Sequence, residues 1–568
     1  MRFIITIWII FLCSGLFGQE LEWAFPISSN GEEDYDEITH VKIDQGNNMY
    51  ICGYFNGIVD FDPFSPPFFL PPDHLSLKRY LFLAKYDSLR NIQWVDLFAS
   101  NKFNISNLEL DGAGNPIISG YPNGYSGVVI DLDPSENNEL VYEDEIFISK
   151  YDPDGNYIWH GTINNHSTSV QKIITDSSED FIVFYSFNDS INVNLKGVTS
   201  MVYGDNYKHS CFVKYSSEAE IKWSFPYYTS ADIEMNDNGE IAIAGNYDSS
   251  YEIDLDPNDT IDCFFSNPFG LSYVTRFNSN GIYQNTFVLN RKDYYDSGIN
   301  DVIIDNENNI YSIFFLYTPI DIDPGPVENI IQYDGSVYSF SNPKNNVIAK
   351  YNNSNELEWF DIISGHSSVY FNSFDDMHLY IYGSYTDSQV DLNSNNNSIN
   401  ETMSGGPGNY IARYDTNGDL DWYIGQGGDI AYTKHIYAAF NALYICGSYY
   451  SDDDLDLNPL TVKFLFNYGY SDGYVLKYTF FYSGITTENK PVIAVAYPNP
   501  SSDFINIKLS NNTTKTKIEL FDCTGKLILL REMNKSNETI DVSNIKSGYY
   551  LMLLTNSKEV YNIPVIIE

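Results

Sequence analysis

A pair of residues, one basic and one aromatic, recurs seven times near the end of an apolar run. Successive copies are 65, 64, 62, 74, 63 and 64 residues apart, by subtraction of their positions. A unit of this length is longer than a helical repeat and fits a four-stranded sheet. The copies are Lys85-Tyr86, Lys150-Tyr151, Lys214-Tyr215, Arg276-Phe277, Lys350-Tyr351, Arg413-Tyr414 and Lys477-Tyr478. The chain is therefore predicted to be an array of one unit.

The two ends of the array complete one another. Most pairs are followed by a strand that carries Trp, as in Asn91-Ile92-Gln93-Trp94, but the seventh pair is not. The segment Glu20-Leu21-Glu22-Trp23 has this missing pattern at the start of the chain. We therefore expect an all-β fold, a seven-bladed β-propeller closed by the N-terminal strand, which leaves no long unpaired edge.

The strands of one unit are expected at about 38–44, 49–55, 80–87 and 91–98. Leu81 and Leu83 alternate with Phe82 and Ala84, so both faces are apolar and should be covered. Asp-, Asn- and Gly-rich turns separate the strands. Sequence segments such as 48–53, 239–245 and 443–447 resemble the bacterial seven-bladed propeller repeats of the SBBP type. That resemblance covers about 20–482.

Composition separates a core-forming, acidic body from a neutral tail. With 43% hydrophobic and 16% aromatic residues, the chain can form a packed core. The net charge of −45 lies before residue 494, because residues 494–568 hold 8 basic and 8 acidic residues. Such a body repels nucleic acid and anionic head groups, and we expect no nucleic-acid partner. A solvated surface is the favoured interpretation of the charge, and cations or basic surfaces remain open.

The N-terminus has the pattern of a secretory signal peptide. Met1-Arg2 precedes a short apolar run and then small residues, which predicts cleavage before Gln19. The run is short for a bilayer span and no later segment qualifies, so we expect no membrane span after signal removal. Of the remaining cysteines, Cys52 and Cys446 occupy equivalent positions. A disulfide between them is open, but buried thiols are favoured.

The C-terminal segment has alternating strands and turns that predict a small β-sandwich. Its landmarks resemble the type A sorting domain of the type IX secretion system of Bacteroidetes. They are Tyr497, Pro498, Asn499, Pro500, Gly525, Gly548, Tyr549 and Tyr550. The resemblance implies passage through the periplasm, recognition by the translocon, removal by a processing protease, and release or attachment at the surface. The expected domains are a signal peptide (1–18), the propeller (19–482), a linker (483–493) and the sorting domain (494–568).

Paired aspartates recur after the second strand of most units. Residues two apart on an extended strand share a side, so each pair could attract a cation. The glycine and distal glutamate of a known calcium loop are missing. We therefore favour Asp side chains that cap backbone N–H groups, and calcium is the alternative. The calcium candidates are Asp60, Asp62, Asp131, Asp133, Asp254, Asp256, Asp321 and Asp323. No other cofactor is expected.

No catalytic motif is found, and no catalytic residue is assigned. We favour a secreted or outer-membrane surface-attached monomer that acts as a binding or adhesion module for a glycan or a surface protein. Long loops such as 63–79 and 325–346 would then form the binding face. The alternative is an extracellular glycan-active enzyme, which requires carboxylates of displaced pKa at the mouth of the propeller channel.

Overall fold

The computed structural model divides the chain into two compact units, Leu21–Thr479 and one that contains Phe480–Glu568. Every regular element among the described residues is a β-strand. No helix in this part of the chain could therefore cross a membrane. The structure describes residues 18–29, 35–62, 68–70, 79–99, 103–122, 129–133, 135, 139–142, 145–164, 168–204, 209–228, 230–248, 252–257, 264–293, 297–331, 345–364, 367–374, 377–385, 389–392, 400–402, 408–427, 431–439, 442–450, 453–454, 464–465, 470–481, 494–497, 501, 503–509, 516–522, 526–533, 537–546, 548–555 and 560–567.

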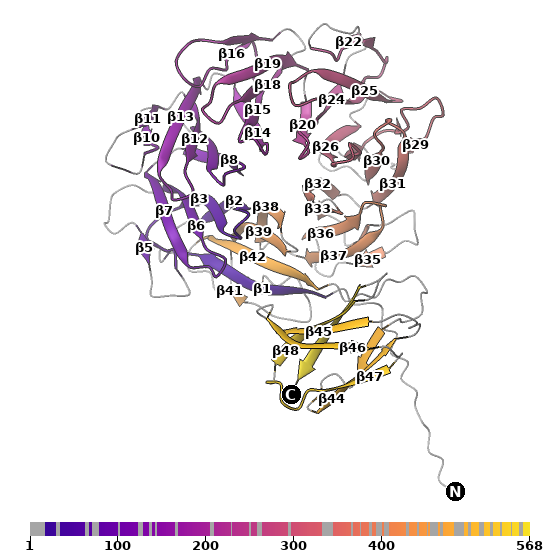
Figure 1. Cartoon of the computed structure of the whole chain (residues 1–568). Coiled ribbons are helices and arrows are strands. Elements are labelled where there is room, and N and C mark those ends of the chain that lie inside the picture. Colours follow the sequence, from indigo (N-terminus) through magenta and orange to yellow (C-terminus); the bar gives the residue numbers. More distant parts are fainter. Residues whose placement is uncertain are drawn as a thin grey trace. The chain divides into compact units, whose positions relative to one another are not determined.

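Seven antiparallel sheets, each built on four strands, make up the larger unit (Figure 1). The first three are β2 (Glu37–Ile43), β3 (Met49–Phe55), β6 (Tyr80–Tyr86), β7 (Ile92–Ala99); β8 (Phe103–Leu110), β9 (Pro116–Pro122), β12 (Glu145–Tyr151), β13 (Tyr157–Asn164); and β14 (Ser169–Thr175), β15 (Phe181–Ser186), β18 (Ser210–Tyr215), β19 (Ile221–Tyr227). The next three are β20 (Ser230–Met235), β21 (Ile241–Tyr247), β24 (Leu271–Phe277), β25 (Tyr283–Asn290); β26 (Gly298–Ile304), β27 (Ile310–Leu316), β30 (Asn345–Tyr351), β31 (Leu357–Ser364); and β32 (Ser367–Phe374), β33 (His378–Tyr385), β36 (Gly408–Asp415), β37 (Leu420–Gly427).

The last sheet contains the N-terminal strand. Its order is β38 (Ala431–Ala439), β39 (Ala442–Tyr449), β42 (Asp472–Phe481) and β1 (Gly18–Ile27). The strand that carries Trp23 thus pairs with the strand that carries Tyr478, as the sequence predicts. This pairing joins the two ends of the array.

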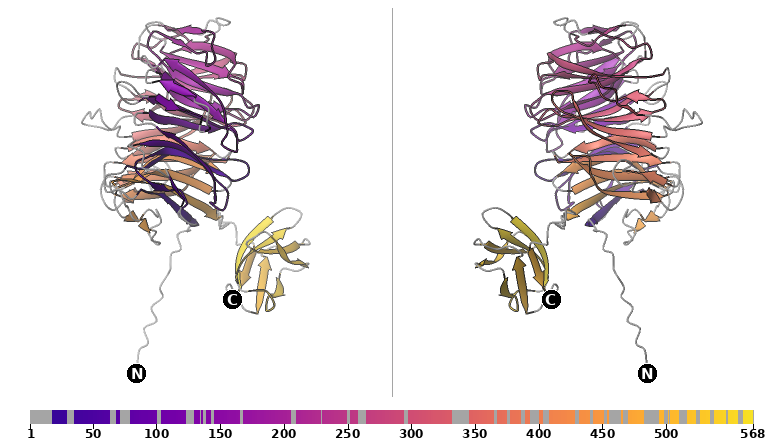
Figure 2. Two further views of the ribbon diagram at one scale, coloured as in Figure 1. Left: turned by 90° about the vertical axis from the view of Figure 1, so that its left-hand side faces the viewer. Right: turned by 90° about the vertical axis from the view of Figure 1, so that its right-hand side faces the viewer.

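The first strands of the seven sheets surround a common centre. Each contacts the next in a circuit of β2, β8, β14, β20, β26, β32 and β38, and β38 contacts β2 again. Figure 1 shows these strands nearest the central opening, with the other strands of each sheet farther out. Figure 2 shows the same sheets from two sides.

A short hairpin follows the second strand of each sheet. The hairpins are β4 (Val59–Asp60) with β5 (Phe69–Leu70), β10 (Val129–Asp131) with β11 (Leu140–Tyr142), β16 (Ser190–Asn192) with β17 (Met201–Tyr203), β22 (Ile253–Asp254) with β23 (Phe264–Phe265), β28 (Ile320–Asp321) with β29 (Ile330–Ile331), β34 (Gln389–Asp391) with β35 (Asn400–Thr402), and β40 (Asp453–Asp454) with β41 (Phe464–Leu465). These hairpins are not predictable from the sequence, because strands of two or three residues carry no periodic signal.

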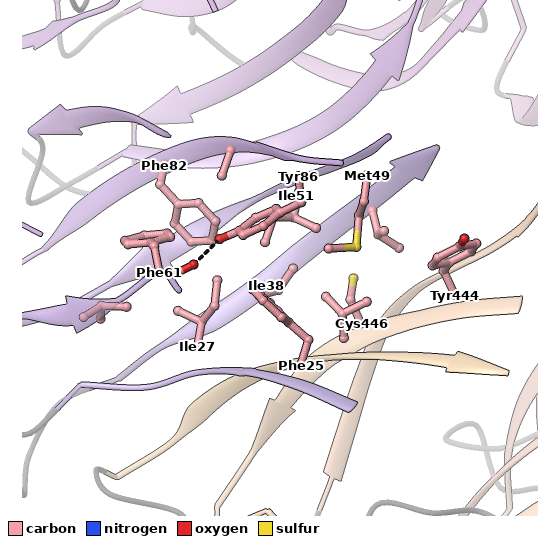
Figure 3. Close-up of a cluster of buried hydrophobic side chains, with 14 of the residues drawn as sticks. Phe25, Ile27, Ile38, Met49, Ile51, Phe61, Phe82, Tyr86, Tyr444 and Cys446 are labelled. Atoms are coloured by element: carbon pink, nitrogen blue, oxygen red, sulfur yellow. Dashed lines mark hydrogen bonds between the residues drawn. The ribbon is translucent and has the colours of Figure 1, made fainter. Parts of the chain in front are cut away.

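The core lies between sheets, since both faces of each sheet are covered. Phe82 and Tyr86 lie in one buried cluster, while Leu81 and Leu83 lie in the next. This division confirms the alternation expected from the sequence. Figure 3 shows the first of these clusters, in which Phe25 of β1 packs among residues of the first and last sheets.

The repeated basic–aromatic pair has two structural roles, and the first is to join neighbouring sheets. Lys85 Nζ and Trp94 Nε1 both donate to the carbonyl oxygen of Pro153, at 2.8 and 3.1 Å, in a turn of the next sheet. The pattern recurs with Lys150 and Trp159 on Ser217, Lys214 and Trp223 on Ser279, and Trp359 on Thr416.

The second role belongs to the tyrosine of the pair. Tyr86 is fully buried, and its hydroxyl donates to the carbonyl oxygen of Phe61 at 2.9 Å, beside the hairpin of its own sheet (Figure 3). Four other copies make the same bond, namely Tyr151 to Leu132, Tyr215 to Val193, Tyr351 to Ile322 and Tyr414 to Leu392. Phe277 lacks a hydroxyl, and Tyr227 of the preceding sheet donates to Leu255 instead. The repeat thus satisfies buried carbonyl groups.

The smaller unit contains two sheets that share one core. One is β43 (Ala494–Tyr497), β44 (Phe504–Leu509) and β47 (Asn537–Asp541). The other is β46 (Leu527–Met533), β45 (Thr516–Asp522), β48 (Gly548–Thr555) and β49 (Val560–Ile567). Ile505 and Ile507 of the first sheet are buried in one cluster with Ile518 and Leu520 of the second.

Candidate functional site

A cleft of about 620 Å³ opens where strands of the first, second and last sheets begin or end. Glu37 is the first residue of β2, Asn104 lies near the start of β8, and Tyr121 lies near the end of β9. Tyr35 and Tyr121 are 42% and 43% exposed, whereas most tyrosines of the sheets are buried. The cleft therefore presents aromatic rings and polar groups to solvent together.

Arg79 and Tyr54 form one part of the cleft wall. The guanidinium of Arg79 lies 3.6 Å from the centre of the Tyr54 ring, a cation–π contact. Burial raises the pKa of Tyr54 to about 12, and nearby Glu37 adds to the shift, so the phenol stays neutral. Burial also lowers the pKa of Arg79 below its usual value, yet an arginine remains charged at neutral pH.

The other charges of the cleft largely cancel. A carboxylate oxygen of Glu37 lies 3.3 Å from Lys434 Nζ. Burial, with a smaller contribution from nearby Lys42, lowers the pKa of His40 to about 4, so the ring is neutral at pH 7. Glu37 also attracts Arg79, so the described residues that line the cleft carry two cations, Arg79 and Lys434, against one carboxylate.

A second cavity, of about 530 Å³, occupies the centre of the circuit and shares His40 with the cleft. It is lined mainly by residues of the first strands. A β-bulge interrupts the first strand of every sheet at the same place. The residues that follow the bulges are His40, Asn107, Lys172, Asp232, Asp301, Ser373 and His435. Bulges re-aim side chains, and strict alternation cannot predict them.

Charged groups in this cavity are paired. Lys172 Nζ lies 2.8 Å from Asp232 Oδ1 and 2.5 Å from Glu234 Oε1. Lys42 Nζ lies 2.5 Å from Glu109 Oε1. Each of these lysines is therefore paired with at least one carboxylate.

Two acids of the cavity have raised pKa values. Burial raises the pKa of Asp301 well above its ordinary value, and the charge and hydrogen bond of Asp232 add to the rise. Burial also raises the pKa of Glu234, against the opposing effect of Lys172. Phe371 N donates to Asp301 Oδ2 at 2.7 Å and holds that side chain in place. Acids with raised pKa values are the groups that general acid catalysis needs.

The paired aspartates lie in the short hairpins. Each strand ends at the first aspartate of its pair, so the second lies beyond the extended segment. Asp131 Oδ1 accepts N–H groups from Asp133 at 3.2 Å and from Glu139 at 2.9 Å. Asp60 and Asp321 accept two N–H groups in the same way, and Asp254 accepts that of Asp256.

An uncharged residue takes the same place in the third unit. Asn192 Oδ1 accepts the N–H groups of Asn194 and Ser200 at 3.2 and 2.9 Å. The hairpin therefore needs a hydrogen-bond acceptor rather than a charge. Within the described ranges, no group of three or more His, Cys, Asp or Glu side chains is arranged to hold a metal ion.

The cysteines of the larger unit are unpaired thiols where they are described. Cys52, Cys211 and Cys446 are free and buried. Burial raises the pKa of Cys52 to about 12, which leaves it unreactive at neutral pH. The bridge between Cys52 and Cys446 is thus not formed. Cys263 and Cys523 lie outside the described residues.

The landmarks of the C-terminal segment lie at strand ends. Tyr497 ends β43, and Gly548, Tyr549 and Tyr550 begin β48. The hydroxyl of Tyr550 donates to the carbonyl oxygen of Lys546 at 2.5 Å. Pro498, Asn499, Pro500 and Gly525 lie outside the described residues, as do residues 1–17 of the expected signal peptide and the linker 483–493.

Similar solved structures do not assign a fold or activity. A protein of unknown function from Bacteroides caccae is 10% identical, with 61% of this chain and 90% of that chain covered and a TM-score of 0.27. A fungal alcohol oxidase in complex with copper is 9% identical, with 96% and 100% covered and a TM-score of 0.34. PorZ, a surface component of the type IX secretion system of Porphyromonas gingivalis, is 10% identical, with 95% and 100% covered and a TM-score of 0.17. These TM-scores are too low for an argument.

No curated protein matches the chain. The family described as "Secretion system C-terminal sorting domain" matches residues 495–568. This match agrees with the landmarks of the segment and implies interaction with the secretion system and its processing machinery. Residues 495–568 are a sorting domain of the type IX secretion system, and the protein is exported to the cell surface or the extracellular space.

Proposed function

We propose that the exported body, residues 19–482, is a seven-bladed β-propeller closed by its N-terminal strand and acts as a binding or adhesion module. The circuit of seven sheets and the pairing of β1 with β42 support this architecture. The observation that carries the binding role is the open cleft, where exposed tyrosine rings stand beside amide and charged groups. Aromatic rings with polar neighbours are suited to stacking against sugars and to hydrogen bonding with them.

A glycan and surface-protein array probed with the purified full chain tests the binding role. We expect saturable binding by the unaltered chain and at least tenfold weaker binding by Tyr121→Ala. Tyr203→Ala is the matched control, because Tyr203 is 67% exposed and does not line the cleft. Equal binding by the two variants would remove the cleft from the proposal.

We further propose that residues 1–18 are a signal peptide, that residues 483–493 are a linker, and that a processing protease cuts this linker. Intact-mass measurement of the exported protein tests both cuts. A mature species that begins at Gln19 and ends within 483–493 is expected. A species that retains residues 494–568 outside the cell would contradict removal of the sorting domain.

A second candidate is a glycan-active enzyme with its site in the central cavity. It is favoured by Asp301 and Glu234, whose raised pKa values suit a general acid. Release of reducing sugar from polysaccharides by the full chain tests it, with Asp301→Asn as the comparison. Activity that Asp301→Asn abolishes would establish the enzyme, whereas binding without hydrolysis would favour the binding module.

A further inference from the structure

Among its described lining residues, the cleft carries one more cation than carboxylate. Arg79 Nε is buried and has no hydrogen-bond partner. Glu37 lies 3.3 Å from Lys434 Nζ and also attracts Arg79, so one carboxylate serves two cations. A buried donor without a partner costs about 1–3 kcal/mol, so such a group invites a ligand that satisfies it.

Because the chain as a whole is strongly acidic, an arginine in a cleft is unusual for this molecule. Acidic residues outnumber Lys and Arg by 76 to 31, so carboxylates are abundant on the molecule. A cleft in such a chain would ordinarily be acidic, yet the lining residues carry Arg79, Lys434 and Glu37. With His40 neutral, these described lining residues sum to one positive charge.

The neighbours of Arg79 limit the kind of anion. Tyr54 lies under the guanidinium, and Tyr35 and Tyr121 line the same cleft with exposed side chains. Asn56 and Asn104 add amide donors and acceptors. Rings for stacking, amides for hydroxyl groups and one guanidinium for an anion together match a sugar that carries a carboxylate or a sulfate.

We infer that the cleft binds an anionic saccharide, with its carboxylate or sulfate on Arg79 and its sugar rings against Tyr35 and Tyr121. This inference rests on the proposed binding function and names the ligand class of the same cleft. Long-range repulsion by the acidic body does not prevent it, because at physiological ionic strength charges are screened beyond about 8 Å.

The test is an array of acidic oligosaccharides bearing uronate, sialate or sulfate, each beside its neutral counterpart, probed with the full chain. Calorimetry then measures affinity for the strongest acidic sugar and its counterpart. We expect the acidic member to bind at least tenfold more tightly. Arg79→Gln should weaken the acidic sugar about tenfold to hundredfold and leave the neutral one nearly unchanged, the usual effect of losing a charge-assisted bond.

Arg531→Gln is the matched control, because it removes the same charge from an exposed position in β46. Thermal unfolding checks that both variants fold, which is expected because Arg79 Nε makes no hydrogen bond. Equal affinity for acidic and neutral sugars, or an unchanged Arg79→Gln variant, overturns the inference. If the chain binds a surface protein but no acidic sugar, only this inference fails. If it binds neither, the proposed function fails with it.

Discussion

Replacing Phe25 by alanine should test how the N-terminal strand completes the larger unit. Phe25 is fully buried, and its ring centre lies 4.9 Å from that of Tyr86 in an edge-on arrangement. Its cluster includes Phe82 of the first sheet and Val475 of the last (Figure 3). The side chain therefore fills the space where the two ends of the array meet.

The expected cost follows from this burial. Truncation of a buried Phe to Ala removes about 3–5 kcal/mol, which includes about 0.5–1.5 kcal/mol for the aromatic pair. Equilibrium unfolding in guanidinium chloride, followed by tryptophan fluorescence, measures the change in the free energy of unfolding. Phe69→Ala is the matched control, because Phe69 is 48% exposed and should cost less than about 0.5 kcal/mol.

The result that would refute this reasoning is equal stability of the two variants. Phe25 would then contribute no more than an exposed ring, and β1 would not hold the first and last sheets together. A larger loss than about 5 kcal/mol would indicate that the unit opens when β1 detaches, because β42 would be left as an unpaired edge.

Three further measurements address other features. Acidification from pH 7 to 4 should destabilise the protein, because the pKa of His40 is about 4 in the folded state and near 6.5 in the unfolded state, so the unfolded state takes up the proton first as pH falls. His40→Gln should reduce this loss of unfolding free energy by about 2–3 kcal/mol. An unchanged pH profile in His40→Gln would contradict the assignment. Gly155→Ala should cost more than Gly114→Ala in unfolding free energy, because both have positive φ but only Gly155 would place a Cβ 2.8 Å from the Trp94 ring; equal costs would show that this contact is not tight. Calcium added to EDTA-treated protein should leave Tm unchanged, because Asp60 Oδ1 already accepts two backbone N–H groups, and a saturable rise in Tm would instead establish a calcium site.

The strands could be predicted from the sequence because their apolar runs and turns are regular. The expected segments 49–55 and 80–87 differ from β3 and β6 by at most one residue at an end. Trp23 could be assigned to the last sheet because its strand supplies the pattern that the seventh copy lacks. These features depend on local pattern and on counting, which a single sequence contains.

The candidate sites could not be predicted to the same degree. His40 and His435 both follow a bulge and line the central cavity, but these bulges leave no mark in the alternation of residues. Arg79 ends the loop 63–79, which was expected to form part of a binding face, but the lack of a hydrogen-bond partner for its Nε is a property of three-dimensional packing. The hairpin role of Asn192 could not be predicted because an amide replaces the expected aspartate.

The hydrogen bonds that join neighbouring sheets depend on side-chain donors but on main-chain acceptors, which affects which positions can be substituted. Lys85 and Trp94 bind the main-chain oxygen of Pro153, whereas the equivalent oxygens elsewhere belong to Ser217, Ser279 and Thr416. Every amino acid supplies that oxygen, so the accepting position itself can change while the donors stay fixed, although Gly155 of the same turn is held by its contact with Trp94. Divergence of the accepting side chain along the array, from Pro153 to Ser217, Ser279 and Thr416, therefore leaves this joint intact.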